Sequence, residues 1–398
     1  MRIWGSALAL LVSGCATVPG QALPGMSPVD LARLNIGAFE GKPVDTVSAP
    51  DTKSEVFAIE SRRMLGYLAA PYEVDAELAT LMDTRLLDAG SSGLFSENTG
   101  AMPPAFKPVW ERNYLIAGAF TTRSNNQVRT LKILTVGLLR FPTEALARTA
   151  AAEMAAATEE LQPGRHPIAV DGYSDIHASS ADDTRGYLYA ARGPVVVMAK
   201  ATLPVADPRA LGTQLKKTLD LQFAKLDRFT PTPVDDILDL PLNPDAMLRR
   251  ALPPAKEESD FDVRAELVAV YEPSAHLHLE RGGAELKQAF EDDGVDLVAQ
   301  NAGTVYRTRD LAAAFHLQQV LLRLGRNDEI IDRPPPLADA GCVKLDAEEP
   351  ILSLEYLCAV VYGRYVAVVG SKGRGGDRFD ATLYQRAAAQ YSILAKSE

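Results

Sequence analysis

The pattern of apolar and polar positions divides the chain into two copies of one plan. The apolar stretch Tyr356–Val369 (YLCAVVYGRYVAVV) is interrupted at Gly363, which predicts two strands joined by a tight turn. A related stretch, Tyr187–Met198 (YLYAARGPVVVM), occurs earlier in the chain. The letters YLYA of the earlier stretch align with YLCA of the later one, and after one inserted residue Gly193 aligns with Gly363.

Two further matches extend this repeat in both directions. Upstream, Val136–Ala147 resembles Ala302–Ala312. Downstream, three positions near the end of an amphipathic helix correspond, namely Gln222, Phe223 and Leu226 with Gln390, Tyr391 and Leu394. Each copy therefore consists of a strand, a helix, a variable loop, two strands and a helix. Three matches in one order favour an internal duplication over chance, and two copies are too few for a solenoid.

We therefore expect an α+β protein with two similar domains. The segment around Gly363 is short enough to be a hairpin, so the predicted sheets are antiparallel rather than parallel. Each sheet is expected to be covered by helices on one face. The predicted boundaries are residues 31–228 for the N-terminal domain and 261–398 for the C-terminal domain. Residues 229–260 form a connector, because their high proline content excludes a continuous helix or a central strand.

The first residues resemble a lipoprotein sorting signal. A short apolar run, Ala7–Val12, precedes Ser13-Gly14-Cys15, as in a bacterial lipobox whose cysteine receives diacylglycerol. We expect residues 1–14 to be a signal peptide, Cys15 to be lipidated, and residues 15–30 to be a flexible tether. The protein would then be anchored at the extracytoplasmic face of the cell membrane. The alternatives are an ordinary secretory signal with a chance cysteine, or a transmembrane helix, for which the run is too short.

Composition and charge narrow the class of protein. Hydrophobic residues make up 47% and charged residues 23%, which is typical of a globular protein. The formal net charge of −11 argues against nucleic acid as a partner, because binding needs a basic face. In an exported protein Cys342 and Cys358 are expected to form a disulfide, whose loop closure contributes about 3 kcal/mol. Free thiols and a metal site are the weaker alternatives.

One short stretch, HLHLE, could carry metal chemistry. If it is a strand, His276, His278 and Glu280 point to one face and could bind a metal. The alternative is a half-buried strand with Leu277 and Leu279 facing inward. We favour the alternative because the sequence identifies no fourth ligand.

Three other polar segments are weaker candidates. An acidic loop could hold calcium, but its spacing does not fit an EF-hand; its residues are Asp171, Asp175, Asp182 and Asp183. The glycine-rich segment Lys372–Gly376 could cradle an anion, although it is not a P-loop. The pair Arg62-Arg63 is expected on a helix surface.

The usual enzyme motifs are missing from the sequence. It contains no Gly-x-Ser-x-Gly, Ser-x-x-Lys or His-Glu-x-x-His. We therefore assign no catalytic, cofactor-binding or metal-binding residue, and we expect no enzymatic activity and no cofactor.

Five strings in the mature chain resemble a known group of proteins. They are AIESRRM at 58–64, PYEVD at 71–75, GVDLVA at 294–299, VYRTRD at 305–310 and GRYVA at 363–367. Together with the lipobox they resemble the uncharacterised lipoproteins of mycobacteria, nocardiae and related actinobacteria. This resemblance implies an envelope-anchored, two-domain α+β protein and brings no catalytic residues. The repeated unit with its cysteine pair is similar, more loosely, to extracellular sensor domains of actinobacterial kinases, which suggests ligand capture by analogy alone.

The sequence therefore predicts a non-catalytic lipoprotein that binds a small or lipidic ligand. The binding site would be a cleft between sheet and helices or between the domains. The alternatives are a module that scaffolds other envelope proteins through an apolar patch, and an envelope hydrolase.

Overall fold

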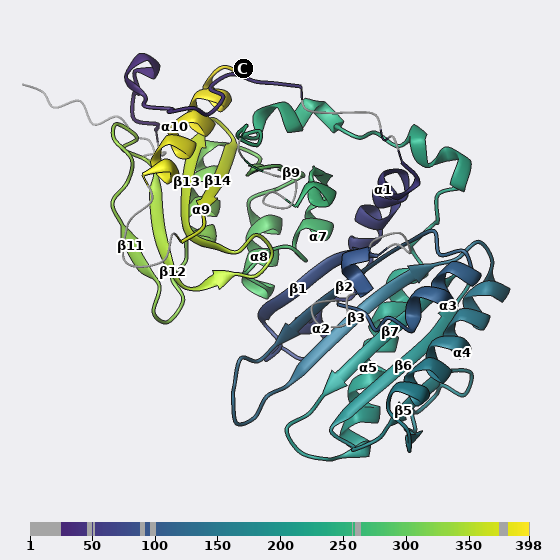
Figure 1. Cartoon of the computed structure of the whole chain (residues 1–398). Coiled ribbons are helices and arrows are strands. Elements are labelled where there is room, and N and C mark those ends of the chain that lie inside the picture. The colour runs from purple at the N-terminus through teal and green to yellow at the C-terminus, as the bar shows by residue number, and fades with distance from the viewer. Residues whose placement is uncertain are drawn as a thin grey trace, which may run out of the picture.

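The computed structural model contains two halves, each built on a seven-stranded antiparallel sheet (Figure 1). It describes residues 25–45, 50, 52–87, 92–95, 101–256, 258, 264–373 and 381–397. Among these residues, no helix combines the length and the hydrophobicity that a bilayer span requires.

The first half has the strand order β1-β2-β3-β7-β6-β5-β4. Its strands are β1 (Thr80–Leu87), β2 (Ala117–Ser124), β3 (Ile133–Arg140), β4 (His166–Pro167), β5 (His177–Ser180), β6 (Arg185–Arg192) and β7 (Val195–Thr202). Its α-helices are α1 (Lys53–Leu65), α2 (Pro71–Val74), α3 (Phe106–Arg112), α4 (Glu144–Leu161) and α5 (Pro208–Leu226).

The second half has the strand order β11-β12-β13-β14-β10-β9-β8. Its strands are β8 (Ala269–Tyr271), β9 (Leu297–Gln300), β10 (Gly303–Arg307), β11 (Glu329–Ile331), β12 (Gly341–Glu349), β13 (Leu354–Tyr362) and β14 (Tyr365–Ser371). Its α-helices are α7 (Pro273–His276), α8 (Ala284–Asp292), α9 (Leu311–Leu321) and α10 (Thr382–Ala395).

Short 3-10 helices occur along the described chain, namely η1 (Leu31–Arg33), η2 (Ser92–Phe95), η3 (Val234–Asp239), η4 (Pro244–Arg250) and η5 (Ala265–Leu267).

The two halves share one connectivity. If β1 to β7 are renumbered β8 to β14, the strand order of the first sheet becomes β8-β9-β10-β14-β13-β12-β11. This is the strand order of the second sheet, listed from its opposite edge. Helices α3, α4 and α5 occupy the places in the chain that α8, α9 and α10 occupy in the second half. The predicted α+β fold with two similar domains is confirmed, and the shared connectivity supports an internal duplication.

Helices cover both faces of each sheet, whereas the sequence analysis predicted one. In the first half α4 and α5 pack against opposite faces of β6 and β7. Val196 and Met198 belong to the core under α4, and Val195 and Val197 belong to the core under α5. The continuous apolar run VVVM is the sequence sign of a strand buried on two faces.

The two hairpins form as predicted, but one sequence match is out of register. Gly193 and Gly363 adopt φ of +54° and +55° in two-residue turns, a conformation that favours glycine. When the turns are superposed through the strand registers, Leu188 is equivalent to Cys358 and not to Leu357. The YLYA and YLCA match is therefore wrong by one residue, which would exchange the two faces of the sheet.

The predicted equivalence of Gln222 and Gln390 holds at the level of single hydrogen bonds. Gln222 accepts from the backbone N–H of Ala69 at 2.8 Å and donates to Tyr67 O at 2.8 Å. Gln390 makes the same pair of bonds, at 2.7 Å each, with Leu252 N–H and Arg250 O. Both glutamines are fully buried. We call each arrangement an amide clasp. In each half, a glutamine of the last helix holds a short segment from elsewhere in the chain, residues 67–69 on α5 and residues 250–252 on α10.

The N-terminal strap, residues 25–45, packs on the second half. Ser27 donates its backbone N–H and its hydroxyl to Asp339 at 2.5 and 2.8 Å. Gly41 O accepts from Ser392 Oγ at 2.9 Å and from Lys396 Nζ at 2.8 Å on and after α10. In Figure 1 this purple segment lies beside the yellow α10. Residues 31–45, which the sequence assigned to the N-terminal domain, and residues 25–30 of the predicted flexible tether thus have their contacts with the second half.

Apolar side chains explain where the strap and the predicted connector lie. Leu31, Leu34, Ile36 and Phe39 of the strap pack against the core under α10, and burying them favours this position. The predicted connector, residues 229–260, also packs closely. Ile237 is buried in the first core, and four connector residues are buried in the second, namely Met247, Leu248, Ala251 and Leu252.

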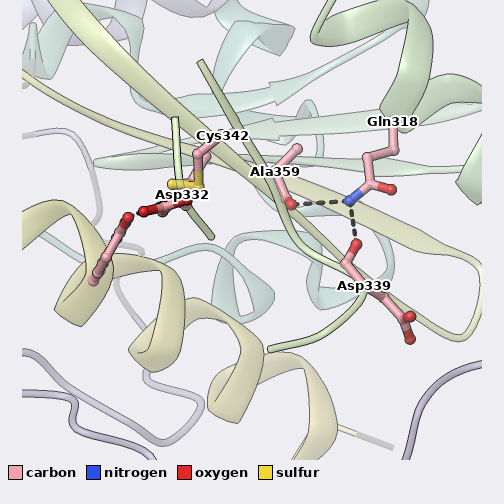
Figure 2. The surroundings of a disulfide bond; sticks show 7 residues. Gln318, Asp332, Asp339, Cys342 and Ala359 are labelled. Carbon is pink, nitrogen blue, oxygen red and sulfur yellow. Dashed lines mark hydrogen bonds between the residues drawn. A yellow bond between two sulfur atoms is a disulfide. The ribbon is translucent and has the colours of Figure 1, made fainter. Parts of the chain in front are cut away.

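Cys342 and Cys358 form a disulfide between neighbouring strands. They are direct partners in the register of β12 and β13, with Cα atoms 4.1 Å apart. Figure 2 shows that Gln318 of α9 donates to the carbonyl oxygens of Ala359 and Asp339 close to this bond, at 2.9 Å each. The disulfide and these bonds hold the sheet, α9 and the chain before β12 together.

We expect Gln390→Leu to lower the free energy of unfolding by about 2 to 4 kcal/mol, because it leaves a buried N–H and a buried carbonyl unpaired. Urea unfolding of the variant and of Gln288→Leu, on the exposed face of α8, gives the comparison. Equal effects of the two substitutions would contradict the amide clasp.

Candidate functional site

A cavity of about 460 Å³ lies in the second half, on the face of the sheet that α8 and α9 cover. This volume is within the range of sites that hold small molecules. Much of its wall is apolar. The wall includes Leu286 of α8, Val320 and Leu321 of α9, Leu357 of β13 and Val368 of β14.

Polar side chains converge at one part of this cavity. We call them the polar cluster, and they are His276, Glu280, Gln300, Thr304, Tyr306 and Glu349. Gln300 ends β9, and Thr304 and Tyr306 alternate on β10, so that all three face the cavity side of the sheet. The Tyr306 hydroxyl donates to Glu280 Oε1 at 2.5 Å. Burial and the Glu280 charge raise the pKa of Tyr306 well above its ordinary value.

Hydrogen bonds fix the orientation of Gln300 and of His276. The Gln300 amide nitrogen donates to Asn301 O at 3.0 Å, and its oxygen accepts from Thr304 Oγ1 at 2.8 Å. The same oxygen lies 3.1 Å from His276 Nε2, so this nitrogen carries the hydrogen. His276 Nδ1 lies 3.0 Å from a Glu280 carboxylate oxygen, but it has no aligned hydrogen-bond partner in the described part of the chain.

Glu349 is the second carboxylate of the polar cluster. It accepts the backbone N–H groups of Ile351 and Leu352 at 2.7 Å each. Burial, and secondarily the Glu280 charge, raise the pKa of Glu349 to about 7, although these N–H groups and Arg264 act in the opposite direction. The cavity therefore contains two interacting carboxyl groups, one of which titrates near neutral pH.

The first half positions the turn that carries His276 and Glu280. Arg123 of β2 donates to Leu277 O at 3.1 Å and to Glu280 O at 2.8 Å. Thr84 of β1 donates to His278 O at 2.6 Å. The orientation of these cavity residues thus depends on contacts with the other half of the molecule.

The predicted strand at HLHLE is wrong. Pro273 occupies the first turn of α7, where proline is favoured, and a turn follows His276. His276 reaches the cavity, whereas His278 is buried in other contacts, and burial lowers the pKa of His278 to about 3. The shared face for metal ligands therefore does not form. Among the described residues, no three His, Cys, Asp or Glu side chains are placed to hold a metal ion.

The acidic loop does not gather into one site. Three of its residues form separate ion pairs, Asp175 with Arg148, Asp182 with Arg185 and Asp183 with His166. Residues 374–376 of the glycine-rich segment and Cys15 lie outside the described residues.

The sequence predicted Arg62 and Arg63 on the surface of a helix, but both side chains contact later parts of the chain. Arg62 donates to Glu266 O in the second half, and Arg63 donates to Thr230 O in the predicted connector, at 2.8 Å each. Both side chains therefore tie α1 to later parts of the chain.

Sequence reasoning missed four members of the polar cluster. Tyr306 lies within the string VYRTRD, which carries the family resemblance but does not indicate a place in a cavity. Gln300 and Thr304 lie in strands, and Glu349 follows other acidic residues. No local pattern in the sequence separates these three residues from ordinary strand and loop positions.

The first half provides an internal comparison for the cavity. The registers of the two sheets make Phe120, Gly137 and Leu139 equivalent to Gln300, Thr304 and Tyr306. Phe120 and Leu139 are buried in the apolar core under α4. The same framework therefore folds with an apolar interior at these positions, and the fold itself does not require the polar cluster.

We expect Glu349→Gln to change the pH dependence of stability. The folded state holds the Glu349 proton more tightly than the unfolded state, so wild type loses stability relative to the variant as pH rises through about 7. Between pH 5 and pH 8 this loss should reach about 3 kcal/mol, because one pKa unit corresponds to about 1.4 kcal/mol. The groups that face Glu349 are Glu280, Tyr306 and Arg264.

Urea unfolding at both pH values measures this difference. Glu285→Gln, at an exposed position on the cavity wall, is the matched control and should follow wild type. A constant difference between wild type and Glu349→Gln at the two pH values would contradict the pKa assignment.

Two family matches cover most of the chain. The N-terminal domain of the family described as domain of unknown function DUF7373 matches residues 47–242, and its C-terminal domain matches residues 247–397. No curated protein matches the chain. The extracellular domain of PknH from Mycobacterium tuberculosis is similar at 14% identity with a TM-score of 0.28, over 41% of this chain and 96% of that domain. The protein belongs to the DUF7373 family, whose function is unknown.

Proposed function

We propose that this protein is a cell-envelope lipoprotein that binds a small amphiphilic ligand in the cavity of its second half and does not transform it. The observation that carries the proposal is the contrast between the halves. Gln300, Thr304 and Tyr306 line a cavity where the first half has Phe120, Gly137 and Leu139.

Physical cost supports a ligand-binding role for this contrast. Burying polar groups costs free energy unless they are hydrogen-bonded, and a charged group costs more. The second half buries several such groups beside an apolar wall, although its duplicate does without them. An apolar cavity with a few convergent polar groups is the usual form of a small-molecule site.

An envelope hydrolase is the second candidate, because His276, Glu280 and Glu349 share one cavity. Two features weigh against it. None of the described residues that line the cavity is Ser, Cys, Lys or Asp, and the Thr304 hydroxyl donates to Gln300 rather than to a base. Glu349 already accepts two backbone N–H groups. Binding without catalysis therefore fits the cavity better.

A scaffold role has less support. Three of the most exposed large apolar side chains are Val128, Val205 and Ile330, at 96%, 71% and 77% exposure. They come from three separate segments, and single exposed apolar residues are normal on soluble proteins.

The anchoring part of the proposal rests on the sequence Ser13-Gly14-Cys15 and on the resemblance to actinobacterial lipoproteins. The strap begins at residue 25 on the second half, so a lipid on Cys15 would attach the molecule through that half. The ligand cavity and the anchor would then belong to the same domain.

We expect native mass spectrometry of the secreted, lipid-free mature chain from a related host to show a bound mass that disappears on denaturation. Leu321→Trp, which adds bulk to the cavity wall, should abolish this mass. Val205→Trp, at an exposed position, should keep it. A wild-type chain that carries no bound mass, or a mass that survives Leu321→Trp, would count against the cavity as the binding site.

We expect Cys15→Ser to move the protein from the membrane fraction to the soluble fraction, because the acceptor of the lipid is lost. Detergent phase partitioning of wild type and variant measures the change. If both proteins fractionate alike, the lipoprotein proposal is wrong.

A further inference from the structure

The polar cluster offers a bound ligand more hydrogen-bond acceptors than donors. The Tyr306 hydroxyl hydrogen is used on Glu280, and the Thr304 hydroxyl hydrogen is used on Gln300. The hydrogen of His276 Nε2 is directed at the same Gln300 oxygen. The oxygens of Glu280 and Glu349 remain as acceptors, because a carboxylate oxygen accepts more than one hydrogen bond.

His276 adds an unsatisfied acceptor to this set. Its side chain is about 2% exposed and lines the cavity. Its Nδ1 stands 3.0 Å from a Glu280 carboxylate oxygen without an aligned hydrogen bond from the described residues. With the ring hydrogen on Nε2, both atoms are acceptors, so neither donates to the other. A ligand N–H group would satisfy both atoms.

The charges of the cavity also favour a ligand with a hydrogen-bond donor, and in particular a positively charged one. Glu349 is buried and Glu280 is partly buried, and the Glu280 charge raises the pKa of Glu349. The two arginines of the cavity wall already have acidic partners, Arg281 with Asp328 and Arg323 with Glu285 at 2.6 Å each. An anionic ligand group would meet the carboxylates without a free cation beside it, whereas a cationic group would be stabilised by them.

We propose that the ligand is a cationic amphiphile, with a protonated amine at the polar cluster and an apolar chain along the leucine and valine wall. This inference rests on the proposed function, because it specifies the ligand class of the same cavity. The apolar wall, which includes Leu286, Leu321 and Val368, separates this ligand from a bare cation or a polyamine. A ligand without a head-group donor or charge would leave His276 Nδ1 without an aligned partner and would add no positive charge beside the two carboxyl groups.

The test uses displacement of the uncharged fluorescent probe N-phenyl-1-naphthylamine from the full-length mature protein at pH 8. Three competitors share one chain length and differ in the head group: decylamine, decanoate and 1-decanol. Uptake of the probe, and its loss in Leu321→Trp, test the proposed function by themselves. We expect decylamine to displace the probe at a concentration about tenfold lower than decanoate, because the carboxylates of the cavity attract one head group and repel the other.

Variants then connect this preference to named residues. Glu349→Gln keeps an acceptor oxygen for one of the two backbone N–H groups and removes one charge, so it should reduce the advantage of decylamine over decanoate and leave 1-decanol unchanged. His276→Phe keeps an aromatic ring without the Nδ1 acceptor and should weaken decylamine selectively. Glu291→Gln, at an exposed position near the end of α8 and outside the cavity wall, should behave as wild type.

The outcomes separate the two levels of the proposal. A protein that takes up the probe but releases it equally well, or better, to decanoate or 1-decanol would overturn the cationic ligand and leave the cavity as an apolar site. A protein that takes up no probe and carries no bound mass would overturn the proposed function as well. An advantage of decylamine that persists unchanged in both Glu349→Gln and His276→Phe would show that the amine lies elsewhere.

Discussion

One buried arginine links the two halves to each other and to the cavity. Arg123 is fully buried, and its guanidinium donates to Ala79 O in the first half and to Leu277 O and Glu280 O in the second. It also lies over the ring of Tyr72, 5.2 Å from its centroid. Burial lowers the pKa of Arg123 to about 10, so the side chain is still charged at neutral pH. A buried charge is costly unless hydrogen bonds compensate it, and the three bonds of the two terminal guanidinium nitrogens of Arg123 need carbonyls from both halves.

This requirement makes the cavity a property of the whole molecule. The carbonyls that Arg123 binds belong to the turn that presents His276 and Glu280. Either half alone would leave the charge or the turn without its partner. The two halves therefore have similar frameworks, and contacts between them position a cluster that lies in only one. The amide clasps of Gln222 and Gln390 remained alike in both halves, whereas the interior positions around Gln300 diverged.

The sequence predicted the framework better than the site. Local periodicity and the glycines at 193 and 363 were enough for the hairpins, and the ordered matches were enough for the duplication. The side-chain alternation of HLHLE suggested a strand, but Pro273 and the carbonyl contacts from Arg123 favour a turn. The match of YLYA with YLCA was misleading because similar letters outweighed the register that the turns impose. Glu349 and Tyr306 meet only through tertiary structure, and no local pattern brings them together.

The strap also affects the order in which the chain can fold. Gly41 O is bonded to Ser392 and Lys396, which lie 351 and 355 residues later in the chain. The part of the strap around Gly41 therefore lacks these partners until α10 has been synthesised. Contacts of such long range form slowly, and they leave apolar side chains exposed while the intervening chain folds. For the second half, completion of the core is a late event that involves both ends of the polypeptide.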